Sequence, residues 1–149
     1  MSQALMIAFV ALVGVLQAVQ APVNNQLNTS MKNVWLAGCI VFGTSLAAFS
    51  LLLVVFHKPL PSTQDLLDSP WYVGLGGLLG ATAVYSMLTL TQRMGAGAFN
   101  GTLVTASILA SLLLDHYGVL GLEKTPLSVA RIGGGVLMVV GVFLISYRN

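Results

Sequence analysis

The chain has 149 residues, of which 56% are hydrophobic and 7% are charged, and its formal net charge is +2. Soluble domains carry about 25% charged residues, so the composition predicts an integral membrane protein, and the small, scattered net charge excludes a nucleic-acid-binding surface. Cys39 is the single cysteine of the sequence and lies in an apolar run, which excludes a disulfide framework and a cysteine-based metal site.

The first predicted element is a transmembrane helix at about residues 3–24, inside a run from Met1 to Met31 that carries no formal charge. About 20 residues at roughly 1.5 Å each cross the hydrocarbon core of a bilayer, and the apolar stretch is that long. We expect the segment to be retained rather than cleaved as a signal peptide, because no Lys or Arg precedes it and Pro22 lies where cleavage would occur.

Amide side chains interrupt the second half of this helix. Gln17, Gln20 and Asn24 are spaced three and four residues apart and therefore share one helical face. Since amides that face lipid would lose their water partners, we expect this face to line a wet substrate cavity. The alternative is hydrogen bonding to a neighbouring helix without a ligand, at about 1 kcal/mol per contact.

The second and third spans are predicted at about residues 34–56 and 70–92. Trp35, Trp71 and Tyr72 lie at the starts of these spans, as is typical of aromatic residues at headgroup depth. A loop with two prolines separates the spans, because prolines and charges cannot continue a lipid-exposed helix.

The third span combines small residues with polar ones. Its glycines at small-xxx-small spacing predict close packing against another helix. Near its far end, Tyr85 and Ser86 are predicted substrate contacts. The alternative is that both side chains only bond a neighbouring helix.

The fourth span, at about residues 97–116, carries a polar stripe. Its members recur at intervals of seven and four residues, at Asn100, Ser107, Ser111 and Asp115. Ser107 and Ser111 are predicted substrate contacts, and Asp115 with His116 is a candidate ion-coupling pair at the mouth of the cavity. The competing interpretation is that this pair marks the end of the helix at the interface, because the uncharged run before it already spans the membrane.

The last span is predicted at about residues 129–147. Its uncharged part is short, but Arg131 and Arg148 flank it and can extend their charged ends outward. All of these runs are continuously apolar rather than alternating, which excludes a transmembrane β-barrel. The sequence therefore predicts an all-α integral membrane protein with five transmembrane helices in a single domain, residues 1–149.

The positive charges are divided equally between the two sides of the membrane. With five spans, Lys58, Lys124 and Arg131 lie on the side of the N-terminus, and Lys32, Arg93 and Arg148 lie on the other side. An excess of Lys and Arg on one side normally sets orientation, and here there is none. We therefore expect the chain to insert in both orientations (dual topology), so that two opposite copies reproduce an inverted repeat. The alternative is a single orientation decided by helix hydrophobicity or by a partner.

Four segments resemble known membrane transporters. Residues 131–145 are similar to the dimerising last helix of the small multidrug resistance family. Residues 14–22, 75–81 and 110–118, with Leu-Leu-Leu-Asp-His as the most specific part, resemble the short five-helix branch of the drug/metabolite transporter superfamily. The resemblance covers essentially the whole chain.

This resemblance implies that the chain is one half of an inverted-repeat transporter. The first four helices of each half would wall the substrate cavity, and the last helix would lie at the periphery and hold the halves together. We therefore expect an antiparallel homodimer whose contact includes Gly134, Gly135 and Gly141, since small residues permit close helix approach.

Two positions depart from the related families. Gln17 stands where the small multidrug resistance proteins carry a glutamate that couples proton and substrate, and an amide cannot titrate. The change removes that route of proton coupling and the counter-charge for organic cations. Ser107 stands where related five-helix proteins carry a glutamine.

The sequence thus predicts a secondary transporter, and by resemblance an exporter, of a small polar solute or metabolite in the inner membrane of a bacterium. The expected partners are the lipid bilayer, a second copy of the chain and the solute, and no cofactor or metal is expected. An enzyme is not expected, because the sequence offers no nucleophile beside a base, no metal-ligand spacing and no phosphate loop. The alternative function is a non-transporting membrane subunit or scaffold that requires a separately encoded partner.

Overall fold

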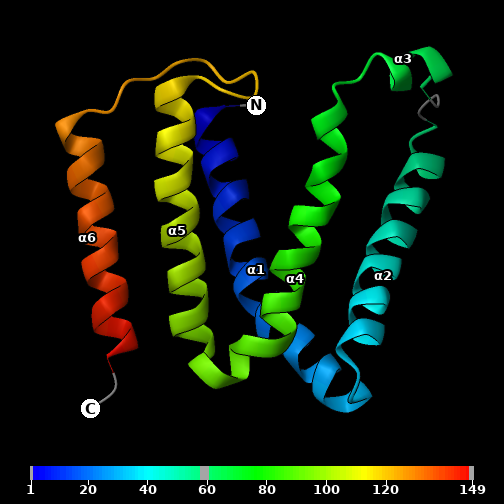
Figure 1. The fold of residues 1–149 in the computed structure, drawn as a ribbon, viewed down its shortest axis with the longest axis horizontal. Coiled ribbons are helices and arrows are strands. Elements are labelled where there is room, and N and C mark those ends of the chain that lie inside the picture. The colour runs from blue at the N-terminus through cyan, green and yellow to red at the C-terminus, as the bar shows by residue number, and fades with distance from the viewer. Residues whose placement is uncertain (1, 58–60, 148–149) are drawn as a thin grey trace. The chain divides into compact units, whose positions relative to one another are not determined.

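The computed structural model describes residues 2–57 and 61–147, and every regular element within these two ranges is helical. In this described part of the chain, five helical segments are long and apolar enough to cross a membrane, which confirms the predicted all-α fold class. They are α1 (Gln3–Met31), α2 (Val34–Val55), a 3₁₀ turn η1 (Trp71–Gly74) continued by α4 (Leu75–Met94), α5 (Ala96–Tyr117) and α6 (Val129–Ser146) (Figure 1). A short helix, α3 (Thr63–Leu67), lies in the connection that was expected to be a loop.

A very short connection joins α1 to α2. Lys32 ends α1 in the left-handed conformation, with φ of 52°, and its backbone N–H donates to the Asn28 carbonyl at 2.9 Å. The next residue, Asn33, caps α2, because its Oδ1 accepts hydrogen bonds from the backbone N–H groups of Trp35 and Leu36, both at 3.1 Å. Two residues therefore reverse the chain and fix the register between the end of α1 and the start of α2.

The helix α1 is longer than its sequence predicts. It continues to Met31 rather than ending near residue 24, and it contains Pro22. Pro22 has no N–H to donate to the Ala18 carbonyl, a loss that membrane helices tolerate when neighbouring groups compensate. In the added turns, Asn25 and Asn28 bond a neighbouring helix, as described below.

The contacts divide the chain into two compact units, Met1–Thr91 and Gln92–Asn149, and each is described by itself. The single domain proposed from the sequence stays a prediction. In the first unit, the most deeply buried apolar residues come from three helices, with Ala21 from α1, Ala37 from α2, and Met87 and Leu88 from α4. This core positions the polar groups of α1 against α4.

The second unit consists mainly of α5 packed against α6. A Cβ placed on Gly135 would lie only 2.9 Å from Leu109 Cδ2, and one on Gly101 would lie 3.2 Å from Val142 Cγ2. The two helices therefore approach each other at glycines. Gly118 ends α5 with a left-handed φ of 64°, and Ser128 caps α6 by accepting a hydrogen bond from the Arg131 backbone N–H at 3.3 Å.

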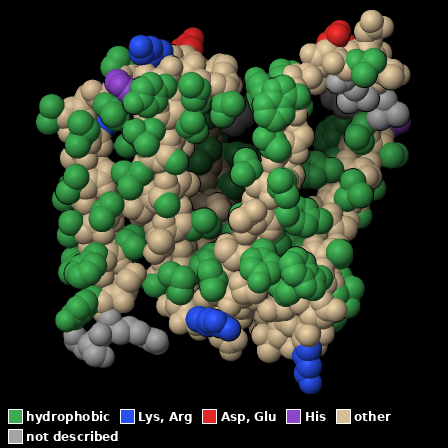
Figure 2. All heavy atoms as spheres, in the orientation of Figure 1, with side chains coloured by type: hydrophobic (Ala, Val, Ile, Leu, Met, Phe, Trp, Pro, Cys, Tyr) green, Lys and Arg blue, Asp and Glu red, His purple; other side chains and the backbone are tan. Residues whose placement is uncertain are grey.

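The surface has the character expected of a membrane protein. Large apolar side chains are exposed along the sides of the helices, whereas the Lys, Arg, Asp and Glu side chains visible in Figure 2 lie at helix ends and connections. Lys58 and Arg148, which contribute to the charge count, lie outside the described residues. Of the remaining basic residues, Lys32, Arg93 and Arg131 lie at or beside helix ends, and Lys124 lies in the connection between α5 and α6.

Candidate functional site

The polar face of α1 extends beyond the three amides that were predicted from the sequence to form it. Because α1 continues to Met31, Gln17, Ala21, Asn24 and Asn28 are spaced four, three and four residues apart on one continuous helical face. Asn25 lies on the edge of this face. The structure divides the face at Ala21, which is fully buried.

The half of this face that follows Ala21 is fixed to α4. The side-chain amides of Asn25 and Asn28 both donate to the backbone carbonyl of Leu88, each at 2.9 Å. Leu88 lies inside α4, so the two amides share a carbonyl that also serves the backbone of that helix. We call this arrangement, Asn25 and Asn28 on the Leu88 carbonyl, the amide clamp.

Asn24 belongs to the same contact. Its side chain is buried, and its Nδ2 lies 3.9 Å from Met87 Sδ, which is a weak acceptor. The structure therefore places Asn24 in the packing between α1 and α4. This agrees with the alternative in which the amides of this face contact a neighbouring helix. Its proposed contact with substrate stays a prediction.

Gln17 and Gln20 lie on the other half of the face and are exposed. Their neighbours on the helix, from Leu5 to Val19, are almost entirely apolar and exposed as well. These two amides are thus exposed polar groups within the apolar part of a membrane-spanning helix. In a bilayer such groups need a partner from protein, solute or cavity water.

An apolar groove of about 260 Å³ lies between α2 and α4 of the first unit. Trp35 and Tyr85 form one part of its wall, with ring centroids 5.8 Å apart and planes inclined by 31°. The side chain of Leu88 lines the same groove, so the residue whose carbonyl is held by the amide clamp also shapes this wall. Tyr85 is 46% exposed at this groove, and Trp35, predicted as an interfacial aromatic, lies beside it; the contact of Tyr85 with substrate stays a prediction.

The predicted serine contacts bond within their own helices or are exposed. Ser86 Oγ donates to the Ala83 carbonyl at 2.7 Å, and Ser107 Oγ donates to the Val104 carbonyl at 2.9 Å. Ser107 and Ser111 are both exposed on α5. A serine hydroxyl that donates to the preceding turn can still accept a bond from a solute, so these residues stay predicted contacts.

Asp115 and His116 hold the connection between α5 and α6. Asp115 Oδ2 lies 3.5 Å from Arg131 Nη1, and the Asp115 carbonyl accepts from the Thr125 backbone N–H at 2.8 Å. His116 Nδ1 accepts from the Leu127 backbone N–H at 3.3 Å, which requires the neutral tautomer with hydrogen on Nε2. The geometry gives both residues a structural role at the helix end, and their role in ion coupling stays a prediction.

The three glycines predicted at a dimer contact have different surroundings. Gly135 is buried against Leu109 of α5 in the same chain. A Cβ on Gly134 or Gly141 would meet no atom within 4 Å. The single chain thus uses Gly135 for its own packing and leaves Gly134 and Gly141 available for another helix.

Sequence reasoning missed Asn25, Asn28 and Arg131 as contact residues. The signal for Asn28 was its spacing of four from Asn24, which the predicted helix end at residue 24 concealed. Nothing in the sequence identifies the Leu88 carbonyl as their acceptor. Within residues 2–57 and 61–147, no group of three or more His, Cys, Asp or Glu side chains could hold a metal ion.

Comparison with known proteins agrees with the membrane fold. A family described as "Putative inner membrane exporter, YdcZ" matches residues 5–144. The inner membrane protein YdcZ of Escherichia coli (strain K12) is 25% identical over 150 residues, which cover 100% of this chain and 99% of that protein. No solved structure matches.

Proposed function

We propose a specific transport function for this chain, which belongs to the YdcZ family of the drug/metabolite transporter superfamily and is a multi-pass inner membrane protein. It is a secondary transporter that exports a small polar solute or metabolite. Two copies in opposite orientations form the working unit, and the cavity between them opens alternately to each side. The family description also favours a transporter over an enzyme.

The exposure of Gln17 and Gln20 carries this proposal. The chain fixes the rest of its amide face through the clamp on Leu88, yet it leaves these two amides uncovered in an otherwise apolar span. If the whole face served packing, we would expect all of it to be buried. A cavity completed by a second copy supplies water and solute to these groups without exposing them to lipid.

Such a cavity would recognise its solute by hydrogen bonds. Each glutamine amide offers two N–H donors and one carbonyl acceptor and does not titrate. Tyr85, open on α4, adds a hydroxyl and an aromatic face. The site therefore suits a polar solute of modest size rather than a permanently charged one, and its binding should change little with pH near neutrality.

The equal division of positive charge supports the oppositely oriented pair. Of the six Lys and Arg residues, three belong to each side, so neither orientation is favoured by loop charge. The uncovered flank of α6 at Gly134 and Gly141 offers a close-contact surface for the second copy.

Solute flux into proteoliposomes that contain only this chain tests the proposal. We expect saturable flux of at least one solute from a panel of neutral metabolites, carboxylates and small cations. Gln17→Leu should reduce the flux more than tenfold, because it removes the hydrogen-bonding group, while the protein stays folded. Gln26→Leu is the matched control, since it makes the same chemical change at an exposed position on the opposite face of α1 and should leave the flux unchanged.

Two results would contradict the proposal. Normal flux in Gln17→Leu would mean that the pathway lies elsewhere. Flux that occurs only after a separately encoded partner is added would instead support the subunit function, in which this chain alone does not transport.

A further inference from the structure

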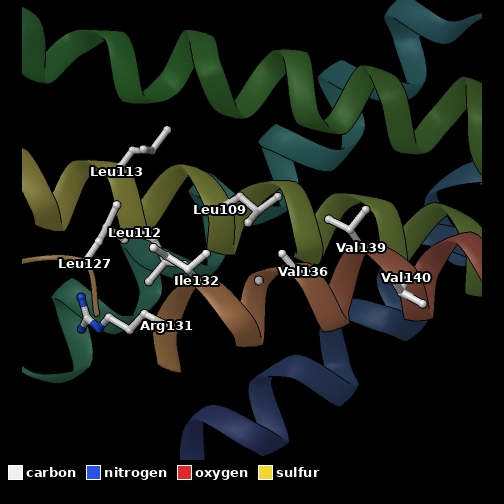
Figure 3. Close-up of a pocket in the computed structure, with 10 residues that line it drawn as sticks. Leu109, Leu112, Leu113, Leu127, Arg131, Ile132, Val136, Val139 and Val140 are labelled. Atoms are coloured by element: carbon white, nitrogen blue, oxygen red, sulfur yellow. The ribbon is translucent and has the colours of Figure 1, made fainter. Parts of the chain in front are cut away.

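A groove of about 360 Å³ runs between α5 and α6 in the second unit (Figure 3). Its walls are aliphatic, except for one cationic side chain, Arg131. Figure 3 shows Arg131 at one end of the groove, beside Leu127, and Val140 at the other end. The lining residues are Leu109, Leu112, Leu113, Leu127, Arg131, Ile132, Gly135, Val136, Val139 and Val140.

The length of the groove matches one leaflet of a bilayer. From Arg131 to Val140 there are nine residue steps (140 − 131) along α6, which at roughly 1.5 Å per residue is about 14 Å. The hydrocarbon core is about 30 Å thick, so a single leaflet contributes about 15 Å. Because Arg131 lies in the first turn of α6, the groove runs from the interface toward the middle of the membrane.

Arg131 has donors to spare for a further anion. Its Nη1 lies 3.5 Å from Asp115 Oδ2, which is a long contact for a charged pair, and its side chain is 35% exposed. A guanidinium carries five N–H donors, and the Asp115 contact uses one of its nitrogens. Its planar fork suits a phosphate.

We propose that this groove is a binding site for a phospholipid, which places one acyl chain along the aliphatic wall and its phosphate at Arg131. An anionic headgroup such as phosphatidylglycerol is preferred, because a zwitterionic headgroup brings its own ammonium toward the guanidinium. The site is independent of the transport function proposed above, since it involves neither Gln17 nor the groove at Tyr85.

A second copy of the chain fits this flank of α6 less well than a lipid does. The glycines that permit close helix contact, Gly134 and Gly141, do not line this groove, and Gly141 lines a separate groove on the other flank of the α5 and α6 pair. On the lipid flank, the β-branched residues Val136 and Val139 line a concave surface. A narrow, flexible acyl chain fills such a surface, whereas a whole helix would not enter it.

Native mass spectrometry of the protein, released from mixed nanodiscs of phosphatidylglycerol and phosphatidylcholine, tests the site. One Arg at a membrane surface contributes about 1 kcal/mol toward anionic lipid, which corresponds to about a fivefold preference. We expect the wild-type protein to retain phosphatidylglycerol over phosphatidylcholine by about that factor. Arg131→Gln should abolish the preference, and Arg131→Lys should restore part of it.

Matched variants separate the parts of the site. Arg93→Gln removes the same charge at the end of α4, outside the groove, and should keep the preference. Asp115→Asn breaks the ion pair but leaves Arg131 in place, so it should keep or increase the preference. Val136→Trp should fill the groove and lower retention of both lipids, whereas Leu137→Trp, at an exposed position outside the groove, should not.

The proposal is overturned if Arg131→Gln retains the wild-type preference. It is equally overturned if Asp115→Asn loses the preference as fully as Arg131→Gln does, because the ion pair rather than the lipid contact would then explain the effect. If Val136→Trp prevented folding, Val139→Phe would serve in its place, and unchanged lipid retention in that variant would exclude the acyl-chain groove.

Discussion

At the scale of single residues, the Leu88 carbonyl of α4 is the acceptor for the polar side chains of α1. Two asparagine amides converge on this one oxygen, each at 2.9 Å. Hydrogen bonds between membrane helices contribute on average about 0.6 kcal/mol and at most about 1.7 kcal/mol, so neither bond alone determines the fold. Because both bonds share one acceptor, the loss of one lets the remaining amide bond the carbonyl without competition.

This sharing predicts non-additive effects in the clamp. Asn25→Leu and Asn28→Leu should each lower the free energy of unfolding by about 0.5–1 kcal/mol, and the double variant should lower it by more than the sum. The free energies of unfolding of the wild type, the two single variants and the double variant, measured in mixed micelles, give the interaction energy between the two amides. Additive losses would show that the two amides act independently, and Gln26→Leu provides a control outside the clamp.

Asp65 and Ser62 form a capping box at the start of α3. Ser62 Oγ accepts from the Asp65 backbone N–H at 3.2 Å, while Asp65 Oδ2 accepts from the Ser62 hydroxyl and from the Ser62 backbone N–H, both at 2.8 Å. The Ser62 hydroxyl first, and its backbone N–H second, hold the pKa of the Asp65 carboxyl below its ordinary value of 3.8. The pair is exposed, so it orders the connection locally.

The lowered pKa gives this turn a defined pH dependence. A depressed carboxyl pKa means that the capping interaction is fully present above the ordinary value and is lost as the pH falls through the lowered pKa. Ser62→Ala should move the Asp65 pKa upward, toward 3.8. Carboxyl chemical shifts from an NMR titration measure the change, and identical titration curves for both proteins would contradict the hydrogen-bonding cause.

At the scale of helices, the glycines of α6 differ in what surrounds them. Gly135 lies where α6 meets Leu109 of the same chain, whereas Gly134 and Gly141 have open space beside them. Neighbouring glycines therefore have different surroundings, because successive residues of a helix point about 100° apart.

This division predicts opposite phenotypes for similar substitutions. Gly135→Leu should destabilise the chain itself by about 1–3 kcal/mol, because the new side chain would overlap Leu109. Gly141→Leu should leave the stability of the single chain nearly unchanged but weaken the dimer, since a bulky side chain separates the helices. Chemical cross-linking in membranes measures dimerisation, and a fully dimeric Gly141→Leu protein would remove α6 from the proposed interface.

The same helices show what the sequence could and could not predict. The spans followed from continuous apolar runs, and the ends of α2, α5 and α6 agree with the prediction to within about one residue. The predicted end of α1 was wrong by seven residues (31 − 24): asparagine is a poor helix former in isolation, and the sequence does not reveal the bonds from Asn25 and Asn28 to the distant Leu88 carbonyl that stabilise these added turns. Likewise, spacing alone groups Gly134 with Gly135, and only packing against Leu109 separates them.

At the scale of the whole molecule, the equal division of positive charge predicts that loop charge alone does not select one orientation. Three positive residues belong to each side, so a small added difference should decide the orientation. The described helices place Lys32 at the α1–α2 connection, and Ser30 and Met31 beside it are exposed. This connection is therefore a suitable place to add charge.

Two added lysines should fix the orientation and remove activity. With Ser30→Lys and Met31→Lys, the side of Lys32 should become cytoplasmic in nearly all copies, so that antiparallel pairs no longer form and flux falls. Gln64→Lys and Ser69→Lys, on the opposite side, should give the opposite orientation. Coexpression of the two variants should restore flux, and full activity of either variant alone would argue against an antiparallel pair.

The most direct test of the antiparallel pair is to measure, in cells, in which orientations the chain inserts into the membrane when its charges are those of the wild type. In a Cys39→Ser background, Gln64→Cys and Gln92→Cys place single, exposed cysteines on opposite sides of the membrane without adding charge. A membrane-impermeant maleimide applied to intact spheroplasts should label about half of the copies in each variant. Complete labelling of one variant together with no labelling of the other would show a single orientation and contradict the antiparallel homodimer.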